Sequence, residues 1–294
     1  MVYCPMPRHK HQKDRGWVFV AAAGAATIAL LVAARLHPTP TRPDSPPEAV
    51  SQAEAGPLAG VAVVLDPGHG GEDPGAVCGG ASEAALTYRT AAEVAAQLRE
   101  AGADVTYTVR SRTLTPSVVL IEPPLVRPTD AILISSGLPL RSRNSPAPLW
   151  QRAATARRVW VSRNGDPNEA RDVFFLSLHY DEFRAPGVSG SVVCVDRRVS
   201  GVPEFARVLA QEMAVGHFGR GTDFRGIAGL SGRKLGVLDP DYNPVPEKAL
   251  LELATLSNTQ DALQAGDPAW RGEMARRIVE AVTRVHRGRA DGTP

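Results

Sequence analysis

The sequence is poor in cysteine, and this shortage argues against several kinds of small stabilised domain. It has 294 residues and three cysteines, Cys4, Cys78 and Cys194, none of which belongs to a CxxC pair. This spacing indicates neither a zinc knuckle nor a disulfide framework. A bond between Cys78 and Cys194 is an alternative in an oxidising compartment, because spacing alone does not show whether the two residues approach each other.

The sequence also lacks an excess of charge of either sign. Its formal net charge is +2, charged residues make up 22% of the chain, and aromatic residues make up 5%. It contains no basic stripe with interleaved aromatic side chains, so we expect no nucleic-acid partner. The hydrophobic content of 43% is sufficient for the core of one large domain or of two small ones.

The N-terminal region predicts export. Residues 1–16 form a basic tail, and an uncharged run follows from Trp17 to Ala34. This pattern predicts a transmembrane anchor over residues 17–36, with the basic tail in the cytoplasm. A signal segment that is cleaved after Ala34 is the alternative, but the run is longer than the usual signal core. In either case we expect the rest of the chain in the periplasm or cell envelope, anchored in the inner membrane or, after cleavage, secreted.

A proline-rich linker separates this segment from a single domain. Residues 37–57 contain many prolines and almost no large apolar side chain, which is typical of a semi-extended linker. The domain then covers residues 58–294.

Within this domain, stretches with strand and helix patterns alternate. We expect strands at 60–66, 104–110, 173–180, 190–196 and 248–258, and helices at 82–101, 203–216 and 270–286. The alternation predicts an α/β fold, with a central, mostly parallel or mixed sheet flanked by helices on both faces. Ligands in such folds gather at the carboxyl ends of strands.

The segment 111–149 does not fit this alternation. It is rich in proline and too long for a connection within a compact domain, so we interpret it as an insertion. A short hairpin between residues 117–122 and 130–136 is expected inside it. The sequence leaves open whether the insertion covers the site until a partner binds or has no role in catalysis.

Two histidines lie at or just past expected strand ends. Of seven histidines, the domain interior holds His69, His179 and His217, and the first two follow strands. The glycine-rich loop around His69 does not match a dinucleotide fingerprint, because Asp73 stands where its third glycine belongs. Two imidazoles and one carboxylate with an open fourth position form a common hydrolytic zinc site. The candidate carboxylates are Asp66, Asp73, Glu83, Asp181 and Glu252.

Each carboxylate also has a simpler explanation. Glu83 could be a solvated residue in the first turn of a helix, where the helix dipole favours it. We expect Asp66 and Asp73 to organise the loop, and either could bond His69. Glu252 lies between two leucines in a strand, and an unpaired carboxylate in so apolar a strand is costly, which favours a functional role.

Four motifs in order carry a resemblance to a known family. They are DPGHGGEDPGA at 66–76, the glutamate at position 83, SLHYD at 177–181 and LLELATLSN at 250–258. Together they closely resemble the zinc-dependent N-acetylmuramoyl-L-alanine amidase family of the amidase-3 type. The resemblance covers about 61–110 and 173–286 and leaves the insertion uncovered.

The resemblance implies a role for each matched residue. It implies that His69, Glu83 and His179 bind Zn²⁺ and that Glu252 is the catalytic glutamate. The implied reaction is hydrolysis of the amide bond between N-acetylmuramic acid and L-alanine in peptidoglycan, during cell-wall remodelling. The resemblance implies peptidoglycan as a partner, and a protein activator is a further expectation. The membrane is expected as a partner because of the N-terminal segment.

The chain departs from the family pattern at three positions. Asp181 stands where the family usually has asparagine, and Ala254 and Thr255 replace a glycine and an aromatic residue. Asp181 adds negative charge beside the site, which bears on substrate preference or metal affinity. Two alternatives therefore stay open: a non-catalytic wall-binding or regulatory module on the amidase fold, and a zinc amidase for another peptide.

Overall fold

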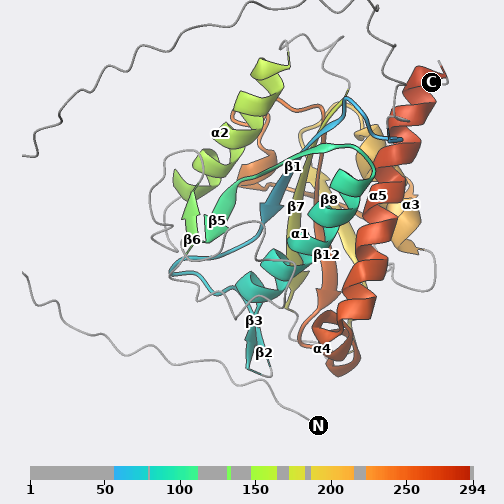
Figure 1. Ribbon diagram of the computed structural model, residues 1–294. Coiled ribbons are helices and arrows are strands. Elements are labelled where there is room, and N and C mark those ends of the chain that lie inside the picture. Colours follow the sequence, from blue (N-terminus) through green and yellow to red (C-terminus); the bar gives the residue numbers. More distant parts are fainter. Residues whose placement is uncertain are drawn as a thin grey trace, which may run out of the picture. The chain divides into compact units, whose positions relative to one another are not determined.

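The protein is described by a computed structural model, shown in Figure 1. The tail, the segment 17–36 and nearly all of the linker lie outside the described residues, as does most of the insertion. None of the helices in the described part of the chain is long and apolar enough to span a membrane. The described residues are 56–78, 80–111, 131–133, 147–163, 172–182, 187–214 and 223–291.

A six-stranded mixed sheet lies at the centre, with strands in the order β11-β8-β12-β7-β1-β4. Four neighbouring strands, β12, β7, β1 and β4, run parallel, whereas β8 runs antiparallel to β12 and β11 runs parallel to β8. The expected α/β fold with a mostly parallel or mixed sheet is confirmed. The strands are β1 (Ala62–Pro67), β4 (Asp104–Tyr107), β7 (Val173–Asp181), β8 (Val192–Asp196), β11 (Leu230–Arg233) and β12 (Glu247–Thr255).

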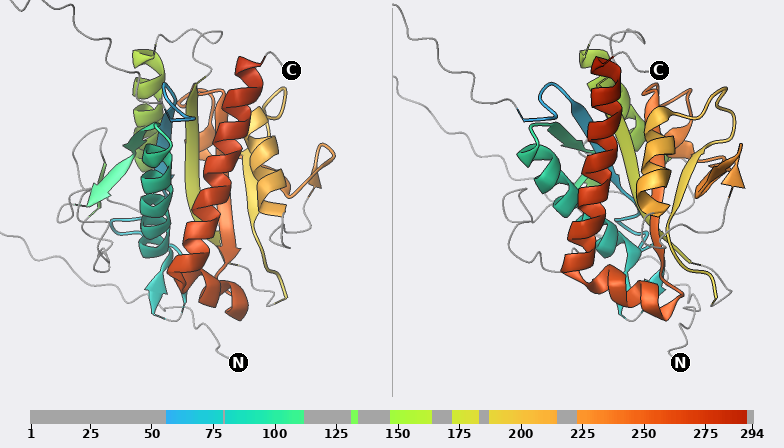
Figure 2. Two further views of the ribbon diagram at one scale, coloured as in Figure 1. Left: turned by 45° about the vertical axis from the view of Figure 1, so that its right-hand side comes forward. Right: turned by 90° about the vertical axis from the view of Figure 1, so that its right-hand side faces the viewer.

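Helices cover both faces of this sheet, as expected. On one face, α1 and α3 both pack against α5, and Figure 2 shows these three helices in front of the strands. On the other face, α2 packs against β1, β7 and the short helix η2. The helices are α1 (Glu83–Glu100), α2 (Ala147–Ser162), α3 (Glu204–Ala214), η2 (Gly236–Leu238), α4 (Thr259–Gly266) and α5 (Pro268–Ala290).

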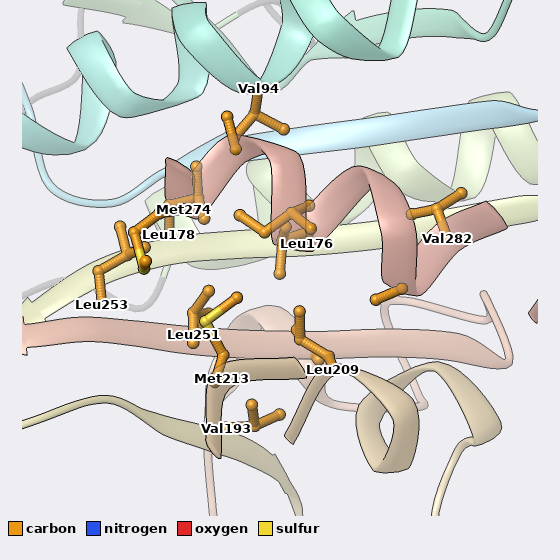
Figure 3. Close-up of a cluster of buried hydrophobic side chains, with 14 of the residues drawn as sticks. Val94, Leu176, Leu178, Val193, Leu209, Met213, Leu251, Leu253, Met274 and Val282 are labelled. Carbon is orange, nitrogen blue, oxygen red and sulfur yellow. The ribbon is translucent and has the colours of Figure 1, made fainter. Parts of the chain in front are cut away.

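The core is divided between the two faces because successive strand residues point to opposite sides. Leu176 and Leu178 of β7 and Leu251 and Leu253 of β12 join the large cluster under α1, α3 and α5, which Figure 3 shows. Phe175 belongs to the smaller cluster on the α2 face. Strands buried on both faces have near-continuous apolar sequences, which explains why β1, β7 and β12 could be predicted from the sequence.

In the described part of the chain, three two-stranded pairs lie outside the main sheet. They are β2 (Val77–Cys78) with β3 (Ala81–Ser82), β5 (Val109–Ser111) with β6 (Ala131–Leu133), and β9 (Asp223–Phe224) with β10 (Ile227–Ala228). Strand β6 falls within the expected 130–136 strand, but its partner is β5, which follows β4 directly. The other expected strand, 117–122, lies outside the described residues. Cys78 and Cys194 are both free thiols, so they form no bond with each other.

Helix α2 was not expected from the sequence. It begins inside the last residues assigned to the insertion, where Pro146 and Pro148 indicated a loop. Proline is well tolerated in the first turn of a helix, because the N–H that it lacks has no intrahelical partner there. Beyond it, Ala153 and Ala156 are both fully buried and lie three residues apart, as on one face of a helix.

Candidate metal centre

The candidate site lies at the carboxyl ends of β1 and β7. After β1 the chain passes Gly68 and reaches His69, whose φ of 60° is unusual for a residue other than glycine. A Cβ atom on Gly68 would lie 2.4 Å from Cε1 of His179, so only glycine allows the chain this close to the imidazole. The two histidines predicted from separate strand ends are therefore neighbours, with ring centroids 4.9 Å apart.

Glu83 lies between the two imidazoles. Its Oε1 atom is 3.0 Å from Nε2 of His69 and 3.2 Å from Nδ1 of His179. One ligand atom from each of the three residues lies within 4.8 Å of the other two, close enough for all three to bind one ion. Two imidazole nitrogens and one carboxylate oxygen match a hydrolytic zinc site, so the donor set fits this metal.

The first turn of α1 fixes Glu83 in this position. The side chain of Ser82 caps the helix by accepting a bond from the Ala85 N–H, and Glu83 follows as the first helical residue. Its Oε2 accepts a bond from the Ala76 N–H and its Oε1 accepts one from the Tyr180 N–H, each at 3.0 Å. With 4% of its surface exposed, Glu83 is not the solvated first-turn residue of the simpler explanation. Burial favours its neutral form, but the two imidazoles outweigh burial and hold its pKa well below the ordinary value.

Asp73 orients the ring of His69. Its Oδ2 lies 3.0 Å from Nδ1 of His69, and its Oδ1 accepts a bond from the Gly75 N–H at 3.1 Å. Nε2 is thereby left to face Glu83. Burial lowers the pKa of His69, but the carboxylates of Asp73 and Glu83 raise it to about 9. A metal cation bound at Nε2 would take the place of the proton that faces Glu83, while Asp73 would keep its bond to Nδ1.

Asp66 organises the loop, as expected. It is fully buried, its Oδ1 accepts bonds from the Thr108 hydroxyl and from Arg152, and its Oδ2 accepts one from the Ser177 hydroxyl at 2.7 Å. Burial raises the pKa of this carboxyl, but the Arg152 guanidinium and the two hydroxyl groups outweigh burial and lower it. Both carboxylate oxygens are therefore occupied within the protein.

Glu252 lies beside the three candidate ligands on the same face of the sheet. It is directly opposite His179 in the register of β12 and β7, and 9% of its surface is exposed. Burial raises its pKa to about 7; His179 and Arg233 act against this rise, and the carboxylates of Asp181 and Glu83 add to it. A carboxyl group with a pKa near neutrality can both accept and return a proton, which general acid–base catalysis requires.

Two arginines at the site were missed in the sequence. Arg152 of α2 reaches the His69 loop, and Arg233 of β11 lies between two carboxylates, 3.8 Å from Oε1 of Glu252 and 3.6 Å from Oδ2 of Asp181. Arg152 could have been noticed in the sequence, because it is next to Ala153 in the apolar stripe of α2. Arg233 could not, because the strand LSGR is too short to show a pattern.

The α/β fold brings together two imidazoles and a buried carboxylate, and it places beside them a carboxyl group whose pKa is near neutrality. This arrangement is that of a candidate metal-dependent hydrolase. The profile of the N-acetylmuramoyl-L-alanine amidase family matches residues 63–284, and the chain belongs to this family. The resemblance carried by the four sequence motifs is confirmed.

Several solved structures have similar folds. The amidase Ami1 from Mycobacterium smegmatis is 20% identical with a TM-score of 0.56, and the match covers 78% of this chain and 97% of that one. The CwlD amidase from Clostridioides difficile, in complex with the GerS lipoprotein, is 17% identical with a TM-score of 0.53 and coverages of 77% and 98%. The catalytic domain of the amidase CwlV from Bacillus (Paenibacillus) polymyxa is 22% identical with a TM-score of 0.51 and coverages of 76% and 97%. A comparison with curated protein sequences gave no significant match.

Proposed function

We propose that this member of the amidase family is a zinc-dependent enzyme that releases stem peptides from peptidoglycan. The bond cleaved is the amide between N-acetylmuramic acid and L-alanine. The observation that carries this proposal is the convergence of His69, Glu83 and His179 on one point, with Glu252 beside them, in a chain of the amidase family.

His69, Glu83 and His179 would hold the zinc ion. When bound there, Zn²⁺ would supply Lewis-acid polarisation of the scissile carbonyl and lower the pKa of the attacking water. Two neutral imidazoles and a single carboxylate leave a net positive charge on this metal, which that chemistry requires. Asp73 keeps His69 in the tautomer that presents Nε2 to the metal.

Glu252 would transfer the proton. It accepts a proton from the attacking water and then donates it to the amine that leaves, because an amide anion is a very poor leaving group. In the metal-free protein its pKa is about 7, so the group gains and loses a proton near neutral pH.

The N-terminal segment would place this activity in the cell envelope. We propose that residues 17–36 anchor the chain in the inner membrane and that residues 37–57 tether the enzyme within reach of the wall, where it takes part in wall remodelling. Membrane fractionation of the full chain and of a chain lacking residues 1–57 tests this: only the full chain should sediment with membranes. A protein partner that activates the enzyme is a further proposal, supported by the neighbour that was solved with a lipoprotein.

The decisive experiment measures bound zinc and the release of stem peptides from purified sacculi. We expect the native protein and Glu252→Ala to bind zinc alike and only the native protein to release peptides. Glu280→Ala, which removes an exposed glutamate of α5, is the matched control and should behave like the native protein.

Two results would redirect the proposal. A native protein that binds zinc and the wall but releases nothing would favour the non-catalytic wall-binding module. Cleavage of simple acyl-peptides without cleavage of muropeptides would favour an amidase for another substrate. A native protein without zinc would contradict the proposed metal centre.

A further inference from the structure

We propose that Arg152 is a positioning residue, which holds the backbone of the His69 loop from helix α2. Arg152 belongs to α2. The bonds described for its guanidinium involve neither Glu252 nor the side-chain atoms that would bind the metal. Arg152 would act through the main chain. This inference rests on the proposed metal-binding role of His69.

The contacts of Arg152 converge on the last residues of β1 and the loop that follows. Its Nη1 donates to Oδ1 of Asp66 at 2.6 Å and to the carbonyl oxygen of Pro67 at 2.7 Å. Its Nη2 donates to the carbonyl oxygen of His69. One planar group therefore fixes three points between residues 66 and 69, and only 3% of Arg152 is exposed.

The groups that surround Arg152 require arginine at this position. Asp66 is fully buried and also accepts bonds from Thr108 and Ser177, so its charge needs a cation within the protein. A lysine would satisfy that charge, but its ammonium is a single point on a flexible stem. Guanidinium carries five donors in a fixed plane, so one group can bind the carboxylate and two carbonyl groups at the same time.

His69 is held from two sides as a consequence. Its carbonyl group is bound by Arg152 and its ring by Asp73, whereas its φ of 60° lies in a region that residues other than glycine rarely occupy. Such a conformation persists only where the surroundings determine it. Without the hydrogen bonds from Arg152, the loop would relax and Nε2 of His69 would move away from Glu83.

A buried ion pair with a purely structural role would give a different result on mutation. Its loss would lower the stability of the protein without changing the metal centre of the molecules that remain folded. A positioning role also weakens metal binding and changes the coordination geometry in the folded protein. The two roles are therefore separated by measurements on the metal itself.

The test uses the full chain in detergent, with Co²⁺ as the probe ion. Arg152→Lys keeps the charge and loses the planar fork, and Arg157→Lys, at an exposed position of the same helix, is the matched control. The affinity for Co²⁺ is measured by chelator competition, the visible spectrum reports the ligand geometry, and thermal unfolding in chelator reports stability without metal. We expect Arg152→Lys to bind Co²⁺ roughly 10- to 100-fold more weakly, with a shifted spectrum, while the control matches the native protein.

A second variant covers the case in which Arg152→Lys does not fold. Asp66→Asn combined with Arg152→Gln removes both buried charges together, so no unpaired charge remains. A native Co²⁺ affinity and spectrum in either folded variant would overturn the inference. A native protein that binds Co²⁺ yet cleaves no peptidoglycan would contradict the proposed function and leave this inference intact, whereas a native protein that binds no Co²⁺ would overturn both.

Discussion

The two faces of the sheet are built from the same strands and differ in what they bury. On the face covered by α1, α3 and α5, β7 contributes Leu176, Leu178 and Tyr180 to one large apolar cluster. On the α2 face, the smaller apolar cluster includes Phe175, but Ser177 and His179 follow it toward the carboxyl end of the strand. Alternation along a single strand therefore separates the residues that stabilise the fold from those of the candidate site. Mutations on the two faces should accordingly change different properties.

The largest expected effect is on catalysis, from Glu252→Gln on the α2 face. Loss of the proton-transfer group should lower kcat/KM for stem-peptide release by about 10²- to 10⁴-fold. The affinity for zinc should stay near native, because Glu252 is not among the three residues that converge on the metal position. Steady-state kinetics with muropeptides and zinc analysis check this, and a variant with more than a tenth of native activity would contradict the role.

On the opposite face, Leu251→Ala should lower the stability of the protein without changing its metal site. Leu251 is fully buried under the helices, so its truncation should lower the free energy of unfolding by about 2–5 kcal/mol. The zinc affinity of the folded protein should not change. Chemical denaturation measures the loss, with Leu263→Ala, at a position that is 67% exposed, as the control near zero. A weaker metal site in folded Leu251→Ala would show that the two faces are not independent.

The pH dependence of stability should carry the signature of Glu252. Its pKa is raised from 4.5 to about 7 in the folded metal-free protein, so the folded state binds more protons than the unfolded state between these values. The contribution is fully present below pH 4.5 and is lost as the pH rises through 7, by an amount on the order of 3 kcal/mol.

The measurement compares native protein and Glu252→Gln, both without metal, by chemical denaturation from pH 4.5 to 7.5. Other groups contribute to both curves in this range, including His69, whose pKa is about 9 in the folded protein and 6.5 in the unfolded chain. The difference between the two curves should therefore fall with rising pH. A constant difference would contradict the raised pKa.

The smallest expected effect is from Asp181→Asn, which restores the residue that the family usually has. Asp181 lies 3.6 Å from Arg233 and raises the pKa of Glu252, so its neutralisation should lower that pKa. We expect the acidic limb of the kcat/KM profile to move to lower pH by less than about one unit, which is at most about 1.4 kcal/mol. Glu182→Gln, at the exposed neighbouring position, is the control. A shift to higher pH would contradict this arrangement of charges.

The sequence predicted those parts of the fold that have strong local patterns. The expected helix at 82–101 is α1, Glu83–Glu100, and the expected strand at 173–180 is β7, Val173–Asp181. The strand expected at 248–258 ends earlier, because Asn258 caps α4 with its side chain. The helix α2 was missed because prolines at its start suggested a loop.

The sequence predicted which residue types form the candidate site but only some of the contacts between them. His69, Glu83, His179 and Glu252 were named from the motifs that surround them, and the fold brings them together; their roles in metal binding and proton transfer are the ones proposed above. Arg152 and Arg233 were not named, since their partners are distant in sequence and are set by the order and register of the strands. Local patterns determine which face a residue occupies, whereas such long-range pairs depend on the completed sheet.

The central position of β7 also determines when the site can form during synthesis. His69 and Glu83 come early in the domain, His179 follows much later, and β7 is paired on both sides only after β12 has been made. Until then, one edge of β7 has no neighbour, and Glu252 has no place opposite His179. A nascent or truncated chain that ends before β12 therefore lacks both Glu252, the proposed proton-transfer group, and the strand that supports the second imidazole. The proposed hydrolysis of peptidoglycan could therefore begin only when nearly the whole domain has been synthesised and folded.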